Sequence, residues 1–429
     1  MSAEEWVRSV LRNLVAKSTN FKLVNKVPEV KDKLGEVETL GLYLHIPFCR
    51  QICPYCPYNK VLYQESLAEL YTNAVLREVD TYADILGKKP VTSFYIGGGT
   101  PTTMLHSGLD RILDRIYRSL NMTCEIHMES HPNDLTDSNL RVIQQLNVQN
   151  LSIGVEALQE RHLKTLHRPY TVKQVKDAVI RAVEMDFSCV NADFIFAIPG
   201  QTYDEIEEAG HTLVDLGVDQ IAAYPLFLFP YTQWPELSRR NRYKKAGLFK
   251  RRKMLSILEG IFYAENYRRT SVWAFTKSNI PKYCSVTVPM YIGLGASGGS
   301  YLSDVLYFNT FNVEAYIQAL KDDRLPIALS LSLSRPMQIA GWLYWRIYET
   351  SFFKSDFRNR FGEEFDRRYG VWARILSMIG LLKENGERIV LSDRGAYWLH
   401  VIQDLFSIDY ISKLWGNSGR DPWPESVIL

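Results

Sequence analysis

The sequence of 429 residues has little of several features that mark specialised protein classes. Only six residues are cysteine, too few for the disulfide framework of a secreted domain. No apolar run approaches the roughly 20 residues that a membrane-spanning helix needs. The 50 basic and 48 acidic residues leave a formal net charge of only +2. The small net charge therefore does not indicate a nucleic-acid or membrane partner.

The N-terminal stretch also lacks the uninterrupted apolar core of a signal peptide. Residues 1–17 carry Glu4, Glu5, Arg8 and Arg12 among their apolar positions. This mixture predicts an amphipathic helix instead. We therefore expect a cytoplasmic protein.

What the sequence does contain, between residues 42 and 227, is a regular alternation of β-rich and helical segments. The expected strands are residues 42–48, 93–96, 125–128, 151–155, 190–198 and 221–226. Several are apolar on consecutive residues, as in parallel strands buried on both faces. Thr136 and Thr202 are candidate N-cap residues of two of the helices between these strands. Successive β-α units predict a parallel barrel or an open doubly wound sheet, with ligands at the carboxyl ends of the strands.

The alternation stops after residue 229. Residues 229–250 contain Pro230, Pro235 and a dense basic group, which are typical of a loop or linker with a solvated face. A mainly helical region follows. Its expected helix over 371–382, short strand over 388–391 and helix over 396–406 resemble a winged helix. Mixed flanking charge favours a packing or lid role over DNA binding.

These patterns divide the chain into four expected units. They are an N-terminal extension, a core barrel, a barrel-completing or linker region and a C-terminal helical domain, at residues 1–40, 41–230, 231–330 and 331–429 respectively.

Three of the six cysteines lie within eight residues, directly after the first expected strand, as Cys49-Arg-Gln-Ile-Cys53-Pro-Tyr-Cys56. Thiolates at this spacing can converge on one soft metal centre. A structural zinc site usually has four ligands. The local motif offers only three, because the residue two positions after Cys56 is Tyr58. A four-iron cube held by three cysteines leaves one iron open, as reductive cleavage of S-adenosylmethionine (SAM) requires. We favour that cluster, and a zinc site and unligated cysteines remain alternatives.

Further candidate ligand-binding residues follow the later strands. The run Gly97-Gly98-Gly99 is expected to expose backbone groups to a ligand, and it lacks the Gly-Lys-Ser/Thr ending of a phosphate loop. Carboxylates can accept hydrogen bonds from ribose or ammonium groups, and an arginine can clamp a carboxylate. The residues of these types at or near strand ends are Glu129, Glu156, Arg168 and Asp193, with His131 and His167 as candidate proton donors.

Seven stretches carry a resemblance to a known family. They are Tyr43-Leu-His-Ile-Pro-Phe-Cys49, Tyr95-Ile-Gly-Gly-Gly-Thr-Pro101, Glu129-Ser-His-Pro132, Leu151-Ser-Ile-Gly-Val-Glu-Ala-Leu158, Leu166-His-Arg168, Asp193-Phe-Ile-Phe-Ala-Ile-Pro-Gly-Gln-Thr202 and Tyr291-Ile-Gly-Leu-Gly-Ala296. The chain resembles the oxygen-independent coproporphyrinogen III oxidase-like radical SAM family. This implies a partial parallel (β/α)6 TIM-like radical SAM barrel with a mainly helical, winged-helix-like C-terminal domain. The first 40 residues match nothing in the family.

The resemblance implies specific roles near the cysteines. Cys49, Cys53 and Cys56 look like the three ligands of a [4Fe–4S] cluster. Tyr43 resembles the family tyrosine that touches SAM near the cluster. Tyr55 resembles the aromatic residue that flanks the adenine.

Other positions resemble the SAM-binding residues of the family. Gly98 and Gly99 look like the pair that faces the methionine amino group. Glu129 and Arg168 resemble the residues at the amino and carboxylate ends of SAM. Asp193 resembles the acid that binds the ribose.

The remaining assignments complete the expected site. Thr100 belongs to the same SAM-binding run. Glu156 stands where the family usually has glutamine, and a ribose contact is expected there. Tyr43 and Glu129 are the expected catalytic residues. Some members bind two SAM molecules, so a second SAM is also open here.

Two differences from the family's sequence pattern affect which reaction is expected. Tyr58 stands where the decarboxylating oxidases often carry a fourth cysteine, and the His-Asn pair of haem-chaperone members is missing around Lys282-Tyr283-Cys284-Ser285. The main expectation is an oxidoreductase that abstracts hydrogen from a tetrapyrrole-like or other bulky substrate, as in oxidative decarboxylation. The alternatives are a class C-type radical SAM methyltransferase and a haem-binding chaperone. The resemblance also implies a low-potential electron donor such as flavodoxin or ferredoxin.

Overall fold

The computed structural model describes residues 21–35, 37–280 and 288–429. The amphipathic helix expected over residues 1–17 and the departure around residues 282–285 lie outside these ranges. Six parallel strands form the centre of the fold. They are β2 (Leu40–Ile46), β5 (Pro90–Gly98), β7 (Ile126–Ser130), β8 (Val148–Glu156), β9 (Cys189–Phe196) and β10 (Gln220–Pro225), adjacent in that order. The expected strands and the (β/α)6 architecture are confirmed.

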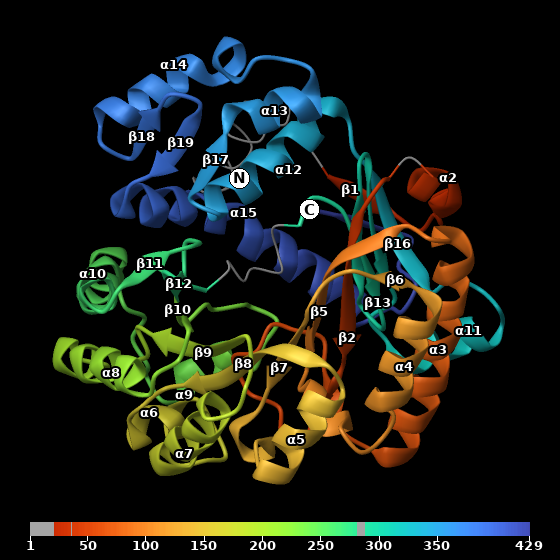
Figure 1. The fold of residues 1–429 in the computed structure, drawn as a ribbon, viewed down its shortest axis with the longest axis horizontal. Coiled ribbons are helices and arrows are strands. Elements are labelled where there is room, and N and C mark those ends of the chain that lie inside the picture. Colours follow the sequence, from red (N-terminus) through yellow and green to blue (C-terminus); the bar gives the residue numbers. More distant parts are fainter. Residues whose placement is uncertain (1–20, 36, 281–287) are drawn as a thin grey trace.

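Helices cover the outer face of these strands (Figure 1). They are α3 (Glu65–Leu86), α4 (Leu109–Ser119), α5 (Asp137–Gln145), α6 (Glu160–Thr165), α7 (Val172–Val183) and α8 (Tyr203–Asp215). Thr136 and Thr202 cap α5 and α8 as expected, because each side chain accepts a hydrogen bond from the backbone three residues on. The strands are buried almost throughout, which explains their continuous apolar runs.

The sheet continues beyond the six parallel strands at both edges. Past β10 lie the antiparallel strands β12 (Ala274–Lys277) and β11 (Tyr267–Arg269), beside α10 (Leu248–Ala264). On the other side, β13 (Tyr291–Leu294) runs parallel to β2. Antiparallel pairing then joins β14 (Gly299–Leu302), β15 (Val305–Asn309), β16 (Ile327–Ser332), β1 (Lys22–Val24) and β20 (Ser426–Ile428).

The C-terminal region is mainly helical and has its own small core. It contains α12 (Arg335–Tyr348), β17 (Ser351–Phe353), α13 (Lys354–Phe361), α14 (Phe365–Met378), β18 (Leu382–Asn385), β19 (Arg388–Leu391) and α15 (Asp393–Ser418). The strands pair in the order β17–β19–β18, and Phe352, Phe357, Phe361 and Phe365 pack beneath them. The winged-helix-like shape is therefore confirmed, although α15 extends well past residue 406. In the described ranges, no helix is both long and apolar enough to cross a membrane.

A buried carboxylate that the sequence did not indicate connects α3 to the far part of the sheet. The carboxylate of Glu78 accepts hydrogen bonds from the Tyr316 hydroxyl (2.6 Å), the Gly295 amide (2.8 Å) and the Asn309 side-chain amide (2.7 Å). Its side chain is fully buried. Burial raises the pKa of Glu78 to about 7 even though all three donors act to lower it.

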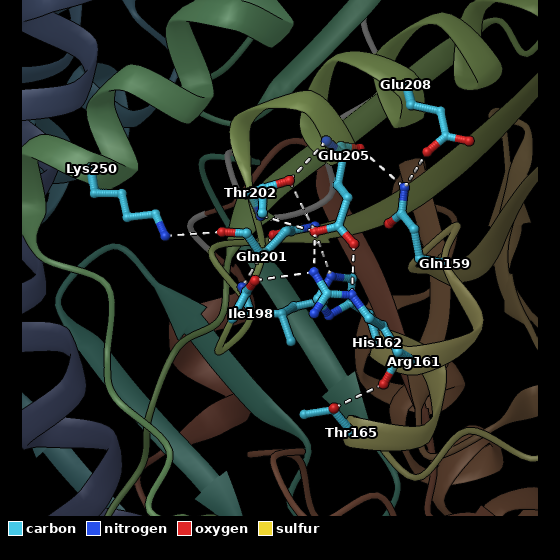
Figure 2. Close-up of polar contacts among 11 residues, drawn as sticks. Gln159, Arg161, His162, Thr165, Ile198, Gln201, Thr202, Glu205, Glu208 and Lys250 are labelled. Atoms are coloured by element: carbon cyan, nitrogen blue, oxygen red, sulfur yellow. Dashed lines mark hydrogen bonds and ion pairs between the residues drawn. The ribbon is translucent and has the colours of Figure 1, made fainter.

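A second carboxylate, Glu205, fixes the N-terminus of α8 (Figure 2). It completes the capping box with Thr202 and accepts two hydrogen bonds from Arg161 at 2.7 and 2.6 Å, while His162 lies 3.2 Å away. Burial acts to raise the pKa of Glu205, but Arg161, the Thr202 amide and His162 outweigh it and lower the pKa to about 2. Residues from α6 are thereby tied to the start of α8.

Glu205→Gln is expected to destabilise the protein by about 1–3 kcal/mol at pH 7, because a charged hydrogen-bond acceptor is lost. A lowered pKa stabilises the fold above the ordinary pKa near 4.5 and loses that effect as pH falls toward 2. The difference between wild type and variant should therefore shrink in acid. Urea unfolding at pH 7 and pH 3 measures it, with Glu207→Gln on the exposed side of the same helix as the control. An equal difference at both pH values would contradict this role.

Candidate functional site

A cavity of about 730 Å³ opens at the carboxyl ends of the parallel strands. One end, which we call the cysteine end, is formed by the loop after β3 (Phe48–Cys49) and by the ends of β5, β7, β8 and β9. Three of the expected site residues, Tyr43, Gly97 and His167, do not line this cavity. The others do: Cys49, Cys53, Tyr55, Cys56, Gly98, Gly99, Thr100, Glu129, His131, Glu156, Arg168 and Asp193.

The three thiols share the cysteine end but have separate partners. Cys49 accepts a hydrogen bond from the Thr100 hydroxyl at 3.5 Å, and Cys53 accepts one from Arg168 at 3.1 Å. Burial raises the pKa of Cys49, and it raises that of Cys56 to about 12. The neighbouring thiols also raise the pKa of Cys56, while Lys60 acts to lower it. The free thiols of Cys49 and Cys56 are therefore poorly ionised without a cationic centre to bind.

The expected convergence of the thiols on one point is not seen. Among the residues that the structure describes, no group of three or more His, Cys, Asp or Glu side chains is placed to hold a single metal ion. Cys49 and Cys53 instead contact Thr100 and Arg168 respectively. The cysteines of an iron–sulfur cube bind different irons, so they need to surround a volume and not a point.

The glycine run serves packing as well as access. A Cβ on Gly98, which has φ +115°, would lie 2.5 Å from the His45 ring, and one on Gly99 would lie 2.7 Å from the Phe48 carbonyl. The expectation of exposed N–H groups is wrong, because Gly98 donates to Glu129 at 3.0 Å and Gly99 donates to the Ile46 carbonyl at 2.7 Å. The glycines let the end of β5 close tightly against the cysteine-bearing segment.

Three carboxylates meet in this end of the cavity. Glu129 accepts hydrogen bonds from the Tyr95 hydroxyl (2.8 Å) and from Gly98. Asp193 accepts from Ser152 at 2.8 Å, and burial, reinforced by Glu156, raises its pKa to about 7. Burial also raises the pKa of Glu129 and of Glu156. Burial of the three acids close together therefore favours their neutral forms unless a cation binds beside them.

Glu156 is less fully paired than its neighbour Arg168. Glu156 ends β8 with φ +63°, and its Oε2 is buried without a hydrogen-bond partner. Arg168 lies 3.8 Å from the other oxygen of Glu156, and its Nε donates to the Tyr170 hydroxyl at 2.8 Å. The hydroxyl of Tyr55 is likewise buried and unpartnered. These orphaned polar atoms line the cavity and are suited to a polar ligand.

Tyr43 lies outside the cavity, and His131 is not in the protonated state expected of a proton donor. The hydroxyl of Tyr43 meets His45 Nδ1 at 2.9 Å, and its ring stacks on Tyr95, which does line the cavity. Burial, with smaller contributions from Arg168 and Arg50, lowers the pKa of His131 to about 3. His131 is therefore neutral near pH 7 and carries no proton-donating imidazolium.

The other end of the cavity was missed by sequence reasoning. We call it the aromatic end, and it is formed by the segment after β10, by β12 and by helices α12 and α15. Its residues are Tyr224, Leu226, Phe227, Phe229, Trp273, Tyr344, Trp345, Tyr348, His400, Asp404, Ser407, Ile408, Ile411 and Trp415. The aromatic run Trp342-Leu-Tyr-Trp345 was a signal in the sequence, but nothing in it placed α12 over the barrel.

The comparisons with known proteins agree with this geometry. The model of the radical SAM superfamily matches residues 43–213, which supply the whole cysteine end. Residues 43–213 therefore carry a likeness to the radical SAM superfamily, and the chain is similar to HemW and HemN proteins. The radical SAM likeness implies a [4Fe–4S] cluster and SAM binding.

Two curated relatives and one solved structure document this radical SAM family likeness. The heme chaperone HemW of Bacillus subtilis is 25% identical over 82% of this chain and 95% of its own. The oxygen-independent coproporphyrinogen III oxidase of Pseudomonas aeruginosa is 22% identical over 88% of this chain and 87% of its own. The structure of coproporphyrinogen III oxidase (HemN) from Escherichia coli shares the fold, with a TM-score of 0.77 at 18% identity, covering 91% and 95% of the two chains.

Proposed function

We propose that Cys49, Cys53 and Cys56 hold a [4Fe–4S] cluster and that the chain cleaves SAM reductively beside it. The observation that carries this proposal is the meeting of three thiols with the buried side chains of Glu129, Glu156, Asp193 and Arg168 in one cavity at the strand ends. When bound, the cluster would supply one electron that breaks the sulfonium C–S bond of SAM and releases a 5′-deoxyadenosyl radical.

The residues of the cysteine end fit these two groups. SAM is a net cation, and the acidic residues Glu129, Asp134, Glu156 and Asp193 line this end together with the basic residues Arg50, Lys60 and Arg168. Bringing a cation beside a buried carboxylate offsets the cost of burying that charge. The unpartnered Glu156 Oε2 and Tyr55 hydroxyl are free to bind a polar ligand. Three thiols, with no fourth among the described residues that line the cavity, suit a cube with one open iron.

The chain's own residues would orient SAM and exclude water. Glu129, already fixed by Tyr95 and Gly98, is placed to accept from the ammonium group. Asp193, fixed by Ser152 and by Asn191 at 3.0 Å, is placed to accept from ribose hydroxyls. Fixed acceptors lose little freedom when the ligand binds, so they position it at low cost.

The direct test is anaerobic reconstitution of the full chain with iron and sulfide, followed by reduction with dithionite in the presence of SAM. We expect an iron–sulfur chromophore near four irons per chain and formation of 5′-deoxyadenosine. A colourless protein with zinc and no iron would overturn the proposal.

Arg168→Ala is expected to weaken SAM binding by about 1.5–3 kcal/mol, or roughly 10- to 150-fold, because a charged hydrogen bond to the SAM carboxylate is lost. Arg168→Lys should recover only part of the affinity, since lysine lacks the planar fork. Anaerobic calorimetry on the reconstituted protein measures both. Arg118→Ala, on the exposed outer surface of α4, is the matched control. Unchanged affinity in Arg168→Ala would refute the contact.

Haem binding and delivery is a second candidate function. It is favoured by relatives named heme chaperone HemW that match over nearly their whole length, and the aromatic end offers flat apolar walls for a macrocycle. Oxidative decarboxylation has less support, because the oxidase relative is 22% identical against 25% and 27% for the two HemW relatives. Titration of the reconstituted protein with haem tests delivery, which requires a one-to-one complex without turnover of haem.

A further inference from the structure

The aromatic end of the cavity has the chemistry of a separate ligand site. The His400 ring lies among aromatic rings, with centroids 5.2 Å from Trp273, 5.6 Å from Tyr348 and 6.4 Å from Phe227. Two aliphatic side chains, Ile408 and Ile411, add further apolar wall from α15. Such walls bury flat, apolar ligand surface with little loss of side-chain entropy.

The aromatic end lacks lysine and arginine side chains in its described wall. Among the described residues that line the whole cavity, the lysines and arginines are Arg50, Lys60 and Arg168, and all belong to the cysteine end. Each has an internal partner there: Asp134 for Arg50, the Cys56 carbonyl for Lys60, and Cys53 for Arg168. None is left to bind a carboxylate at the aromatic end.

The ionisable carboxyl group that lines the aromatic end is that of Asp404. It lies 3.3 Å from His400 Nε2, and His400 Nδ1 is 3.0 Å from Gln403 Oε1. Gln403 in turn donates to the Tyr344 carbonyl at 2.7 Å. These contacts hold an acidic group in the wall. Arg251 and Lys245 act on the Asp404 carboxyl but do not line the cavity, so an anionic ligand placed there would contact an acid and no lysine or arginine.

Two tryptophans of the aromatic end have buried indole N–H groups. The Nε1 atoms of Trp273 and Trp415 are buried and have no acceptor in the protein. Trp273 is only 5% exposed, and both residues line the cavity. A buried N–H without an acceptor costs free energy that an uncharged oxygen of a ligand can recover.

We propose that the aromatic end binds a planar aromatic ligand that carries uncharged acceptors, such as ring carbonyls, and places no carboxylate inside the cavity. This inference rests on the proposed function, because the ligand would be the substrate of the 5′-deoxyadenosyl radical. It excludes polycarboxylate porphyrinogens with their side chains inside the site.

Two isosteric probes separate shape from charge: acridone-2-carboxamide and acridone-2-carboxylate. Both are flat, fluorescent tricycles with a ring carbonyl, and they differ in the charge of one substituent. We expect the reconstituted full-length protein to bind the amide at least about tenfold more tightly than the acid, a difference of roughly 1.4 kcal/mol. Fluorescence titration under anaerobic conditions, with SAM present and without reductant, gives both affinities.

Two variants test the residues. Trp273→Phe keeps a ring and removes the N–H, so amide affinity should fall about 3- to 10-fold. Ile411→Lys adds a cation to the wall, so the preference for the amide should disappear or reverse. Equal binding of acid and amide by the wild type, or no amide binding at 1 mM, would overturn the inference. Formation of 5′-deoxyadenosine without probe is measured in parallel, so failure of SAM cleavage is seen separately from failure of ligand selection.

Discussion

Replacing any one of Cys49, Cys53 or Cys56 by alanine is expected to reduce 5′-deoxyadenosine formation to background, a loss of at least about 100-fold. Loss of an outer-shell partner of a metal site already costs 10- to 100-fold, and loss of a thiolate removes a direct bond to iron. The visible iron–sulfur absorption of the reconstituted protein should fall in parallel. Both quantities are measured on the same anaerobic preparation.

The controls separate cluster loss from misfolding. Cys124→Ala removes a half-buried thiol that does not line the cavity, and it should retain cluster and cleavage. Thermal unfolding of the four alanine variants before reconstitution should agree within a few degrees, because the cluster thiols form few other contacts. Retained cleavage in all three cluster variants would refute the ligand assignment.

The core of the fold could be predicted because its sequence signals are local. Each parallel strand is a short apolar run, since it is buried on both faces, and each helix start has its own capping residue. The Cys49–Cys56 motif was informative for the same reason, because its spacing alone limits what the thiols can bind. Strand ends gather on one face of such a sheet, which is why Glu129 and Asp193 lie together as expected.

The parts that could not be predicted depend on contacts between distant segments. The aromatic end is built from α12 and α15, more than 100 residues beyond the barrel strands in sequence, and no periodicity in either helix says which surface it faces. The engagement of Arg168 with Cys53 joins residues 115 positions apart. Glu78 also looked like an ordinary helical glutamate, because its partners Gly295, Asn309 and Tyr316 lie more than 200 residues away.

Glu78→Ala is expected to destabilise the protein by about 3–5 kcal/mol, the largest stability effect among the changes considered. The substitution leaves the Tyr316 hydroxyl, the Gly295 amide and the Asn309 amide without their acceptor in a dry core, and each such loss costs about 1–3 kcal/mol. The tyrosine hydroxyl can rotate to another acceptor, which keeps the total below the sum. Urea unfolding gives the free energy, and a loss under 1 kcal/mol would contradict this role.

Glu78→Gln distinguishes the shape of this side chain from its ionisation. The raised pKa of Glu78 means that the unfolded chain releases the proton near pH 4.5 and the folded chain releases it near pH 7. This stabilising contribution is full below pH 4.5 and is lost as pH rises to about 7. Glutamine keeps one acceptor and does not titrate, so its stability relative to wild type should improve across that window, by up to about 3 kcal/mol. If the two proteins instead keep a constant difference from pH 4.5 to 7.5, Glu78 ionises as readily in the fold as in the unfolded chain, and its three donors outweigh its burial.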